Sequence, residues 1–368
     1  MTVYLDHAAT TPMRREALDA MLPWLTTQYG NASGGHRVAR NARRAVDEAR
    51  EAVAGVLGCE PGEVVFTGGG TEADNLAVTG GRGSGGTVVC TSIEHHAVLH
   101  AVEAVGGGVI GVDGDGRVDL TALAVAVDGG AALVSVMLAN NEVGTIQDLD
   151  AVAAVIDGRA VLHTDAVQAA PWLDLPTRAG AAAMISVAAH KFAGPQGVGA
   201  LVVRRGVHLE PLIRGGGQER ERRSGTHNVA GIVGMAAALV AAAADRVDAA
   251  TRAAALRDRL VAGLRCRLDG VVESAAGAER LPNIAHLRIA GVENESLLVL
   301  LDDAGVCAAA GSSCASGAME PSHVLAAMGV SRADARTAIR LSVGRPTVEA
   351  DVETAVCVIA AAVDRLRR

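Results

Sequence analysis

Short apolar runs separated by glycine-rich or helical intervals dominate the middle of the chain. Six runs of four or five residues, rich in valine, lie at 64–67, 87–90, 133–136, 160–163, 184–187 and 199–203. They do not alternate apolar and polar residues, which is typical of strands that are buried on both faces. The pattern therefore predicts an α/β fold with a mostly parallel sheet of about seven strands.

Helical periodicity appears before this region and again after it. From His36 to Leu57 the apolar residues recur at steps of three or four, with arginines and acids between them. After Leu268 the runs at 284–289 and 339–343 predict strands, and 295–303 and 347–366 predict helices. We therefore expect a large α/β domain over residues 13–250 and a smaller α+β domain formed by residues 1–12 and 251–368.

Composition and charge narrow the classes of function. The chain has 368 residues and a net charge of -8, which argues against a nucleic-acid surface. The basic stretch at 214–223 contains Glu219 and Glu221, so we expect a solvated or interface segment there. The longest uncharged apolar stretch, 229–244, is too short to span a bilayer and predicts a buried helix rather than a membrane anchor.

The cysteines and the N-terminus bear on the compartment. Six cysteines are spaced irregularly with no C-x-x-C pair, a spacing that fits neither a disulfide framework nor a zinc site. The chain begins directly with strand-like residues, so we expect no signal peptide. We expect reduced thiols and a cytoplasmic location.

Lys191 is the single lysine among 33 basic residues. Arginine can replace lysine for charge but not as a nucleophile towards a carbonyl, because its guanidinium does not lose a proton in proteins. A neutral amine that condenses with an aldehyde needs lysine. A surface lysine without function is the alternative, and the position of Lys191 between two strand-like runs favours the functional interpretation.

Three further motifs follow strand-like runs, where ligands bind in open α/β sheets. Gly68-Gly69-Gly70-Thr71 opens a helix and suits an anion such as phosphate, or is a tight turn only. Asp165 could pair with a protonated ring nitrogen, or serve as a helix N-cap. In Glu94-His95-His96 the carboxylate is not spaced from the histidines as in zinc metalloproteases, so we expect no metal there. One of the two histidines could instead act as an acid/base or stack on a ring. Together with Lys191, these motifs predict an enzyme that uses pyridoxal phosphate.

Two more residues stand out in the C-terminal part. Cys314 is flanked by glycine, serine and alanine, a setting that suits an accessible nucleophile on a mobile loop, whereas an incidental loop cysteine is the alternative. Arg340 lies inside an apolar strand pattern and must be paired. A substrate carboxylate is the favoured partner, and an internal salt bridge is the other.

Ordered motifs over nearly the whole chain resemble the cysteine desulfurases of the class V aminotransferase group, within the fold type I pyridoxal-phosphate enzymes. The motifs are Tyr4 to Pro12, Phe66 to Asn75, Glu94 to Leu99, Asn140 to Thr145, His163 to Gln168, His190-Lys191, Gly215 to Glu219, Arg223 to Thr226, and the Cys314 loop with Pro321 to Leu325. The resemblance implies conversion of L-cysteine to L-alanine, with the sulfur passing to Cys314 as a persulfide and then to an acceptor protein.

The resemblance also implies roles for single residues. Lys191 would form an imine with the cofactor, Asp165 would pair with the ring nitrogen, Gln168 would reach the ring hydroxyl and His95 would stack on the ring. The phosphate would be held by Gly70, Thr71, His190 and, across a homodimer, Thr226 of the partner subunit. The substrate would be bound by Asn141 and Arg340. No resident metal is implied, with at most a transient contact between Cys314 and an iron–sulfur cluster.

Some positions depart from the pattern of the family, and some rival functions share its scaffold. Ala188 stands where a phosphate-binding serine is common in the family, so one hydroxyl contact to the phosphate is missing or comes from Ser186. His7 and Gln196 also differ from the residues that are common in the family at their positions.

The rival functions are a selenocysteine lyase or cysteine-sulfinate desulfinase, a class V aminotransferase, and a non-catalytic sulfur-scaffold or nucleotide-binding protein. The sequence does not name the final acceptor of the sulfur.

Overall fold

Seven strands form the central sheet of the computed structural model, which describes residues 2–83, 85–311 and 322–368. In spatial order they are β2 (Val64–Thr67), β8 (Gly199–Val203), β7 (Met184–Ala188), β6 (Val161–Asp165), β5 (Ala131–Ser135), β3 (Thr87–Thr91) and β4 (Gly108–Ile110). Strands β7 to β4 are parallel, and β8 is antiparallel to both of its neighbours. The mostly parallel seven-stranded sheet is confirmed; its seventh strand, β4, was not among the apolar runs.

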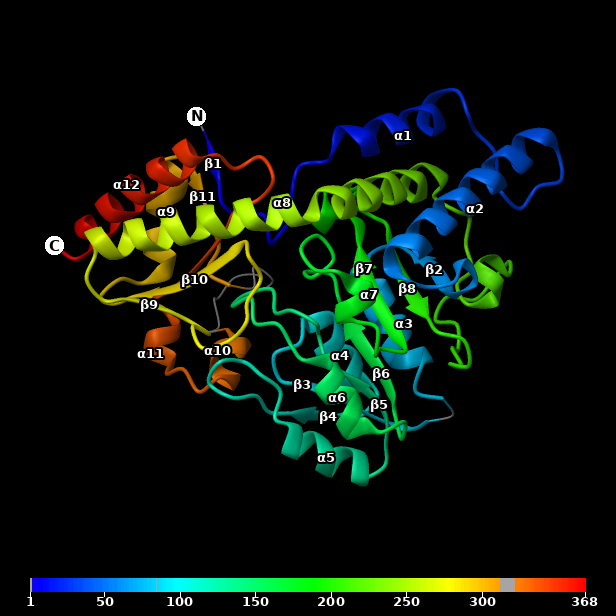
Figure 1. The fold of residues 1–368 in the computed structure, drawn as a ribbon, viewed down its shortest axis with the longest axis horizontal. Helices are drawn as coiled ribbons and strands as arrows, with labels where there is room; N and C mark the ends of the chain where they lie inside the picture. The colour runs from blue at the N-terminus through cyan, green and yellow to red at the C-terminus, as the bar shows by residue number, and fades with distance from the viewer. Residues whose placement is uncertain (1, 84, 312–321) are drawn as a thin grey trace.

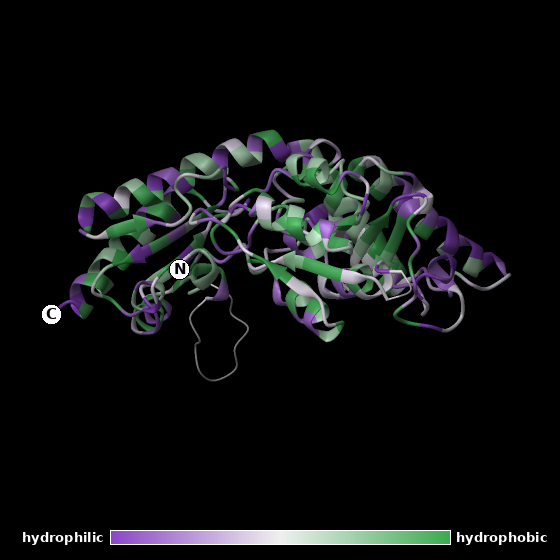
Figure 2. Cartoon of the chain, turned by 90° about the horizontal axis from the view of Figure 1, so that it is seen from below, coloured by the Kyte–Doolittle hydropathy of each residue, from purple (hydrophilic) through white to green (hydrophobic). Residues whose placement is uncertain are grey.

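The sheet is buried on both faces because alternate side chains of each strand enter two different cores. In β2, Val64 and Phe66 contribute to one core and Val65 to the other. The first core also contains residues of α1 (Arg15–Thr26), α2 (Arg37–Leu57), α5 (Leu120–Asp128), α6 (Leu149–Ile156) and α7 (Leu175–Arg178). The second contains residues of α3 (Gly70–Gly80) and α4 (His96–Ala104). Figure 2 shows the strands as green, apolar ribbons inside the molecule.

Helix α2 illustrates how the sequence sets its own limits. His36 caps its start, where the ring Nδ1 accepts a hydrogen bond from the Ala39 N–H. Gly58 ends it with φ +64, a left-handed conformation that costs glycine little. The helix predicted over these residues is confirmed.

A smaller layer of strands and helices forms a separate core. Its antiparallel sheet has the order β12 (Ala338–Ser342), β10 (Ile284–Ile289) and β9 (Val271–Glu273), and β1 (Val3–Tyr4) pairs in parallel with β11 (Val306–Cys307). Helices α9 (Asn294–Asp303) and α12 (Glu349–Leu366) contribute to this core, whereas α10 (His323–Ala327) and α11 (Arg332–Ala335) contribute to a further core with Ile93, Met137 and Val143. Val3 and Leu5 are buried in this core, which unites the N-terminus with residues 253–363.

Helix α8 (Val229–Arg267) joins the two parts of the molecule (Figure 1). Its first half contributes Ile232, Met235 and Leu239 to the large core, and its second half contributes Leu256 and Leu260 to the small one. Because α8 is continuous through residue 250, a domain boundary at that residue stays a prediction. By length and composition α8 could cross a membrane, yet half of its apolar window is buried within the protein, as in ordinary core helices.

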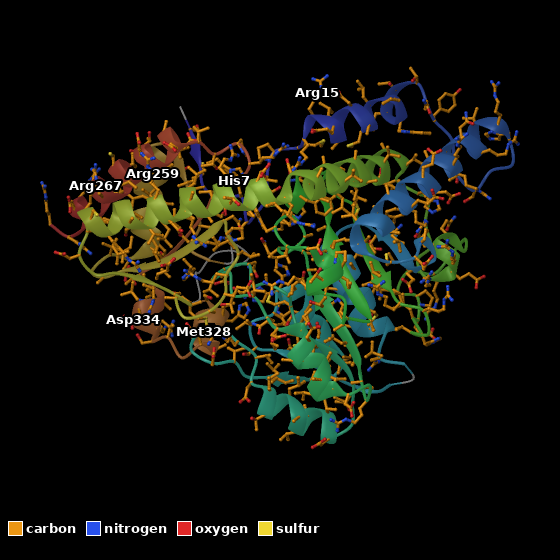
Figure 3. The ribbon with its side chains drawn as sticks, in the orientation of Figure 1. His7, Arg15, Arg259, Arg267, Met328 and Asp334 are labelled. Atoms are coloured by element: carbon orange, nitrogen blue, oxygen red, sulfur yellow. The ribbon has the colours of Figure 1, made fainter. Side chains whose placement is uncertain are left out.

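Charged side chains lie mainly at the periphery, as Figure 3 shows for Arg15 and Arg259. His7, in contrast, lies near the middle of α8.

The 3-10 helices are η1 (Pro61–Glu63), η2 (Ala189–Phe192) and η3 (Gln218–Glu221). In η3 the solvated alternative is wrong for Glu219, which is buried within this chain, whereas an interface for the rest of the segment stays a prediction. The Glu219 carboxylate accepts from both Arg50 guanidinium nitrogens at 2.6 and 2.8 Å and from the Phe66 N–H at 2.9 Å.

This buried pair leads to a test of stability. Burial would raise the pKa of Glu219, but hydrogen bonds from His227 and Arg50 outweigh burial and lower the pKa to about 2. Glu219 therefore stabilises the fold fully above its usual pKa of 4.5, and this contribution is lost as the pH falls towards 2. Glu219→Ala should lower the free energy of unfolding by about 3–5 kcal/mol near neutral pH, because it leaves the Arg50 charge buried and unpaired.

Chemical denaturation would measure the change. Arg44→Ala is the matched control, because the Arg44–Glu48 pair is largely exposed, and should cost about 0.5 kcal/mol or less. Equal effects of the two substitutions would contradict the structural role of the buried pair.

Candidate functional site

Lys191 lies just beyond the carboxyl end of β7, on η2. Its Nζ donates to the carbonyl oxygens of Ala8 at 2.6 Å and Ala9 at 2.9 Å. The N-terminal segment that follows β1 therefore lies across the end of the central sheet and fixes the direction of the amine. This places the amine where a parallel sheet binds ligands.

Asp165 ends the neighbouring parallel strand β6, where it pairs in register with Ser186 of β7. The carboxyl group is buried, and its Oδ1 accepts from the Val167 N–H at 2.8 Å. Burial raises the pKa of Asp165 to about 6, against the opposing effects of the Val167 N–H and the positive charge of Lys191. A cation at this position would hold Asp165 ionised.

The start of α3 provides an anion-binding geometry. Gly69 has φ +148, which favours glycine, and helix α3 begins directly after it at Gly70. A Cβ on Gly70 would lie 3.0 Å from the Val167 side chain and 3.3 Å from Ala188, so the helix start packs closely against the ends of β6 and β7. The amide groups at this helix start face a cavity of about 740 Å³ lined by Gly68 to Thr71, Thr10, His190 and Gln196, among others.

The hydroxyl contact expected from Ser186 is not available to this cavity. Ser186 is fully buried, its Oγ lies 2.9 Å from His163 Nε2, and it lines neither this cavity nor the one beside Lys191. Hydroxyl groups at this end come from Thr71 and from Thr10, whose Oγ1 lies 3.2 Å from His190 Nδ1. A contribution of Ser186 to a phosphate in this cavity is therefore not supported, and whether the threonines take its place stays a prediction.

His95 caps α4, with its Nδ1 accepting from the Ala97 N–H at 3.1 Å. Burial, followed by the charges of Lys191 and neighbouring histidines, lowers the pKa of His95 to about 4. Burial and Lys191 likewise lower the pKa of His190 to about 4. Both rings are therefore neutral at neutral pH, so each can offer a lone pair.

Arg340 forms the internal salt bridge that the sequence left as the second choice. Its guanidinium donates to Asp6 Oδ1 at 2.7 Å and to the carbonyl oxygen of Asn141 at 2.9 Å. Its Nε is buried and has no hydrogen-bond partner among the described residues. Arg340 nevertheless lines the cavity beside Lys191, so binding of a substrate carboxylate stays a prediction that competes with this pair.

One cavity of about 280 Å³ brings most of the predicted residues together. It is lined by Gly70, Thr71, His95, Asn141, Asp165, Gln168, His190, Lys191 and Arg340, with Asp74, Gly311 and others. Gln168 also donates from Nε2 to the Ala8 carbonyl at 2.7 Å. A buried carboxyl for a ring nitrogen, an amine and a helix start for an anion fit the chemical groups of pyridoxal phosphate.

Two predicted residues are not among the lining residues of this cavity. Thr226 is exposed and lines none of the three cavities described here, which suits a residue that serves another subunit. Cys314 lies outside the described residues. Gly311, which precedes that segment, lines the cavity, and Ser322, which follows it, donates to Glu142 at 2.5 Å.

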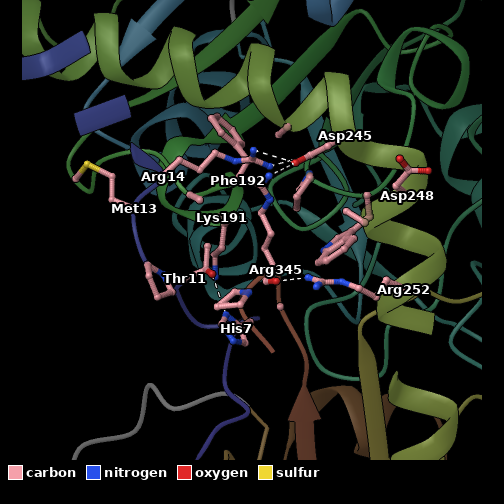
Figure 4. Close-up of a pocket in the computed structure, with 18 of the residues that line it drawn as sticks. His7, Thr11, Met13, Arg14, Lys191, Phe192, Asp245, Asp248, Arg252 and Arg345 are labelled. Atoms are coloured by element: carbon pink, nitrogen blue, oxygen red, sulfur yellow. Dashed lines mark hydrogen bonds and ion pairs between the residues drawn. The ribbon is translucent and has the colours of Figure 1, made fainter. Parts of the chain in front are cut away.

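A further cavity of about 590 Å³ shares the lining residues Lys191 and Gln168 with the cavity of about 280 Å³ (Figure 4). The labelled side chains show Arg14 and Arg345 both directed at Asp245, with ion-pair distances of 2.9 and 2.6 Å. His7 lies at its edge, with Nδ1 2.8 Å from the Thr11 hydroxyl. This hydrogen bond gives His7 a structural role in holding the N-terminal segment.

Sequence reasoning did not single out the buried polar residues behind the site. Asp74 and Glu94 are buried carboxyls, and His163 is a buried histidine between two serine hydroxyls. Within the described parts of the chain, no group of three or more histidines, cysteines or acids could hold a metal ion. The signal for Asp74 was present, since it lies one helical turn after the glycines of α3, but its direction depends on the packing of that helix.

Comparison with known proteins agrees with this geometry. The family model for class-V aminotransferases matches residues 3–354. An IscS-like cysteine desulfurase of Mycobacterium tuberculosis is 47% identical, covering 99% of this chain and 97% of its own length. A solved NifS-like protein superposes with a TM-score of 0.91 at 35% identity, over 99% of this chain and all of its own.

A second solved structure is similar over most of the chain. The structure described as SspA in complex with cysteine superposes with a TM-score of 0.80 at 29% identity, over 94% of this chain and 100% of its own. The match of the family model and the near-complete coverage of relatives at this identity show the family. This chain belongs to the class-V aminotransferases and, within them, to the pyridoxal-phosphate-dependent cysteine desulfurases.

Proposed function

We propose that this protein takes the sulfur atom from L-cysteine and leaves L-alanine, with pyridoxal phosphate as cofactor and Cys314 as the first sulfur acceptor. The observation that carries the proposal is the single cavity that joins Lys191, buried Asp165 and the start of α3. Relatives named cysteine desulfurase and a similar structure described with cysteine support the choice of substrate.

Each side chain has a task that follows from its position. The amine of Lys191 would hold the cofactor covalently and would afterwards move the α-proton of the substrate. Asp165 would face the ring nitrogen, Gln168 the ring hydroxyl, and the neutral His95 would lie against the ring, where it could accept or return a proton. Bound pyridoxal phosphate supplies electron withdrawal from the α-carbon.

The anionic groups meet separate parts of the cavity. The amide groups at Gly70 and Thr71, with His190, would hold the phosphate at the start of α3. Asn141 and Arg340 hold the carboxylate of the substrate, for which Arg340 exchanges part of its pairing with Asp6.

In the sulfur-transfer step, one sulfur atom passes from a carbon of the substrate to the thiol group of Cys314. The thiolate of Cys314 attacks the substrate sulfur, an S–S bond forms, and the C–S bond breaks with its electron pair remaining on carbon. That carbon takes a proton and becomes the methyl group of alanine, while Cys314 carries the persulfide. A sulfur-acceptor protein then receives the outer sulfur atom.

An exposed apolar stripe supports a homodimer in which Thr226 reaches the phosphate of the partner subunit. On and just after α1, Leu18, Leu22, Leu25 and Tyr29 recur at helical spacing and are 43%, 50%, 63% and 76% exposed. A helix face of this kind is typical of an interface with another chain. We propose that α1 contributes to that interface.

Cys314→Ser tests the chemistry directly. The variant should keep the yellow colour of the bound cofactor and release no alanine from L-cysteine, because the attacking thiolate is gone. Quantifying alanine and sulfide after incubation with L-cysteine measures the effect. Cys266→Ser, at an exposed thiol on α8, is the matched control and should turn over normally.

The same assay separates the rival functions. Normal alanine release by Cys314→Ser would refute the assignment of the sulfur acceptor. Amino transfer to a keto acid by the unmodified protein would indicate an aminotransferase, and a preference for selenocysteine or cysteine sulfinate would indicate those lyases. A protein that binds no cofactor would support the non-catalytic alternative.

Gly70→Ala tests the phosphate end of the site. The added Cβ would press on Val167 and Ala188 and shift the start of α3, an overpacking that costs about 1–3 kcal/mol. We expect the Kd for pyridoxal phosphate, measured by titration of cofactor-free protein, to rise roughly tenfold or more. Gly62→Ala, where a Cβ meets nothing within 4 Å, should leave the Kd unchanged. Similar values for both variants would argue against a phosphate at this helix.

Leu25→Glu tests the interface on α1. A charge in the middle of the apolar stripe should dissociate the dimer, which sedimentation velocity would report as a halved mass. Val125→Glu places the same charge at a residue of α5 that is 68% exposed and should leave the mass unchanged. A dimer that persists in Leu25→Glu would place the interface elsewhere.

A further inference from the structure

A second carboxyl group, that of Asp74, lies in the cofactor cavity beside Asp165. Asp74 projects from α3, is only 2% exposed and lines the same 280 Å³ cavity. Its Oδ1 is buried without a hydrogen-bond partner among the described residues. Burying an ionised carboxylate in this way is costly, so its charge state needs an explanation.

The immediate neighbours of Asp74 are neutral. Its carboxyl group is hydrogen-bonded with Ser186, and Oδ1 lies 3.8 Å from His163 Nε2. The His163 ring is held by two hydroxyl groups, with Nε2 2.9 Å from Ser186 Oγ and Nδ1 2.8 Å from Ser135 Oγ. Burial lowers the pKa of His163 to about 3, so this ring supplies no positive charge at neutral pH.

The charged groups around Asp74 also disfavour a second anion. Burial and then the nearby carboxylate of Asp165 raise the pKa of Asp74 against the opposing effect of its hydrogen bond with Ser186, and Glu94, before α4, adds to the rise. Burial raises the pKa of Glu94 itself to about 8. On η2 and just before α4, His190 and His95 are neutral, so the cations that line this cavity are Arg340, which is paired with Asp6, and Lys191, whose charge acts on Asp165.

We infer that Asp74 is a positioning residue that stays protonated beside the cofactor, so that Asp165 is the one carboxylate that meets the ring nitrogen. The inference rests on the proposed function, because it assigns the charges around the proposed cofactor. Of the two buried carboxyls, Asp165 has the positive charge of Lys191 acting on it, whereas Asp74 has no such cation. The proton therefore goes to Asp74, as in other pairs of interacting buried carboxyls.

A protonated Asp74 also fixes the direction of the hydrogen bonds behind it. Its O–H donates to Ser186 Oγ, the Ser186 hydroxyl donates to His163 Nε2, and His163 Nδ1–H donates to Ser135 Oγ. An ionised Asp74 would instead accept from Ser186 and require the proton on Nε2 of His163. The tautomer of His163 therefore reports the charge of Asp74 independently of catalysis.

Infrared difference spectroscopy of the full-length, cofactor-bound protein tests the inference near pH 7. Asp74→Asn should remove one carbonyl band of a protonated carboxylic acid, and ¹⁵N NMR of the wild-type protein should show His163 protonated on Nδ1. Glu94→Gln is the matched control, since it should remove a different band and leave that of Asp74. Absence of a band that depends on Asp74, or a proton on Nε2 of His163, would overturn the inference.

The absorbance of the bound cofactor gives a second readout. Replacing a neutral Asp74 by isosteric asparagine should leave the midpoint of the pH titration of the visible band unchanged within error. Removing a negative charge there would lower the midpoint by about one unit or more, and such a shift would also overturn the inference. Failure of desulfurase activity with the infrared and NMR results intact would refute the proposed function and not the charge of Asp74.

Discussion

The burial of the central sheet on both faces is the constraint on which the rest of this structure depends. Apolar side chains of successive strand residues enter two cores, and most polar side chains that line the cavity lie at or beyond the carboxyl ends of the strands. Asp165 and Lys191 occupy these ends on adjacent strands, and the start of α3 is anchored beside them. The cavity is therefore a product of the sheet, and its chemistry comes from the last residue of β6 and from segments that follow other strands, such as η2 and the start of α3.

The N-terminal segment closes this arrangement from the other side. Leu5 is buried in the small core, Asp6 pairs with Arg340 of β12, and the carbonyl oxygens of Ala8 and Ala9 receive the Lys191 amine. A few residues therefore connect the small core to the reactive amine of the large one. Movement of the small core relative to the sheet would change the hydrogen bonds of that amine directly.

Electrostatics in the site are set mainly by burial. Lys191 is a cation among neutral histidines, and the carboxyls of Asp74, Asp165 and Glu94 all have raised pKa values because they are withdrawn from water. A bound cofactor would add one positive charge, that of its protonated ring nitrogen. The three buried carboxyls would still outnumber the positive charges of this nitrogen and of Lys191. Protonation of the surplus carboxyls is the least costly solution, since a buried charge without a partner is strongly unfavourable.

The sequence by itself determined the class of fold, the helix from His36 to Leu57, the strand at 284–289 and the set of groups that share one cavity. These depend on local periodicity and on residues that end strands, which are properties of short segments. Strand β4 was not predicted because it has only three residues, one of them glycine, and is therefore shorter than the apolar runs of four or five residues. The tertiary structure alone decided the partners of Arg340 and Glu219 and the burial of Asp74, because each depends on segments far apart in the chain whose approach is set by packing.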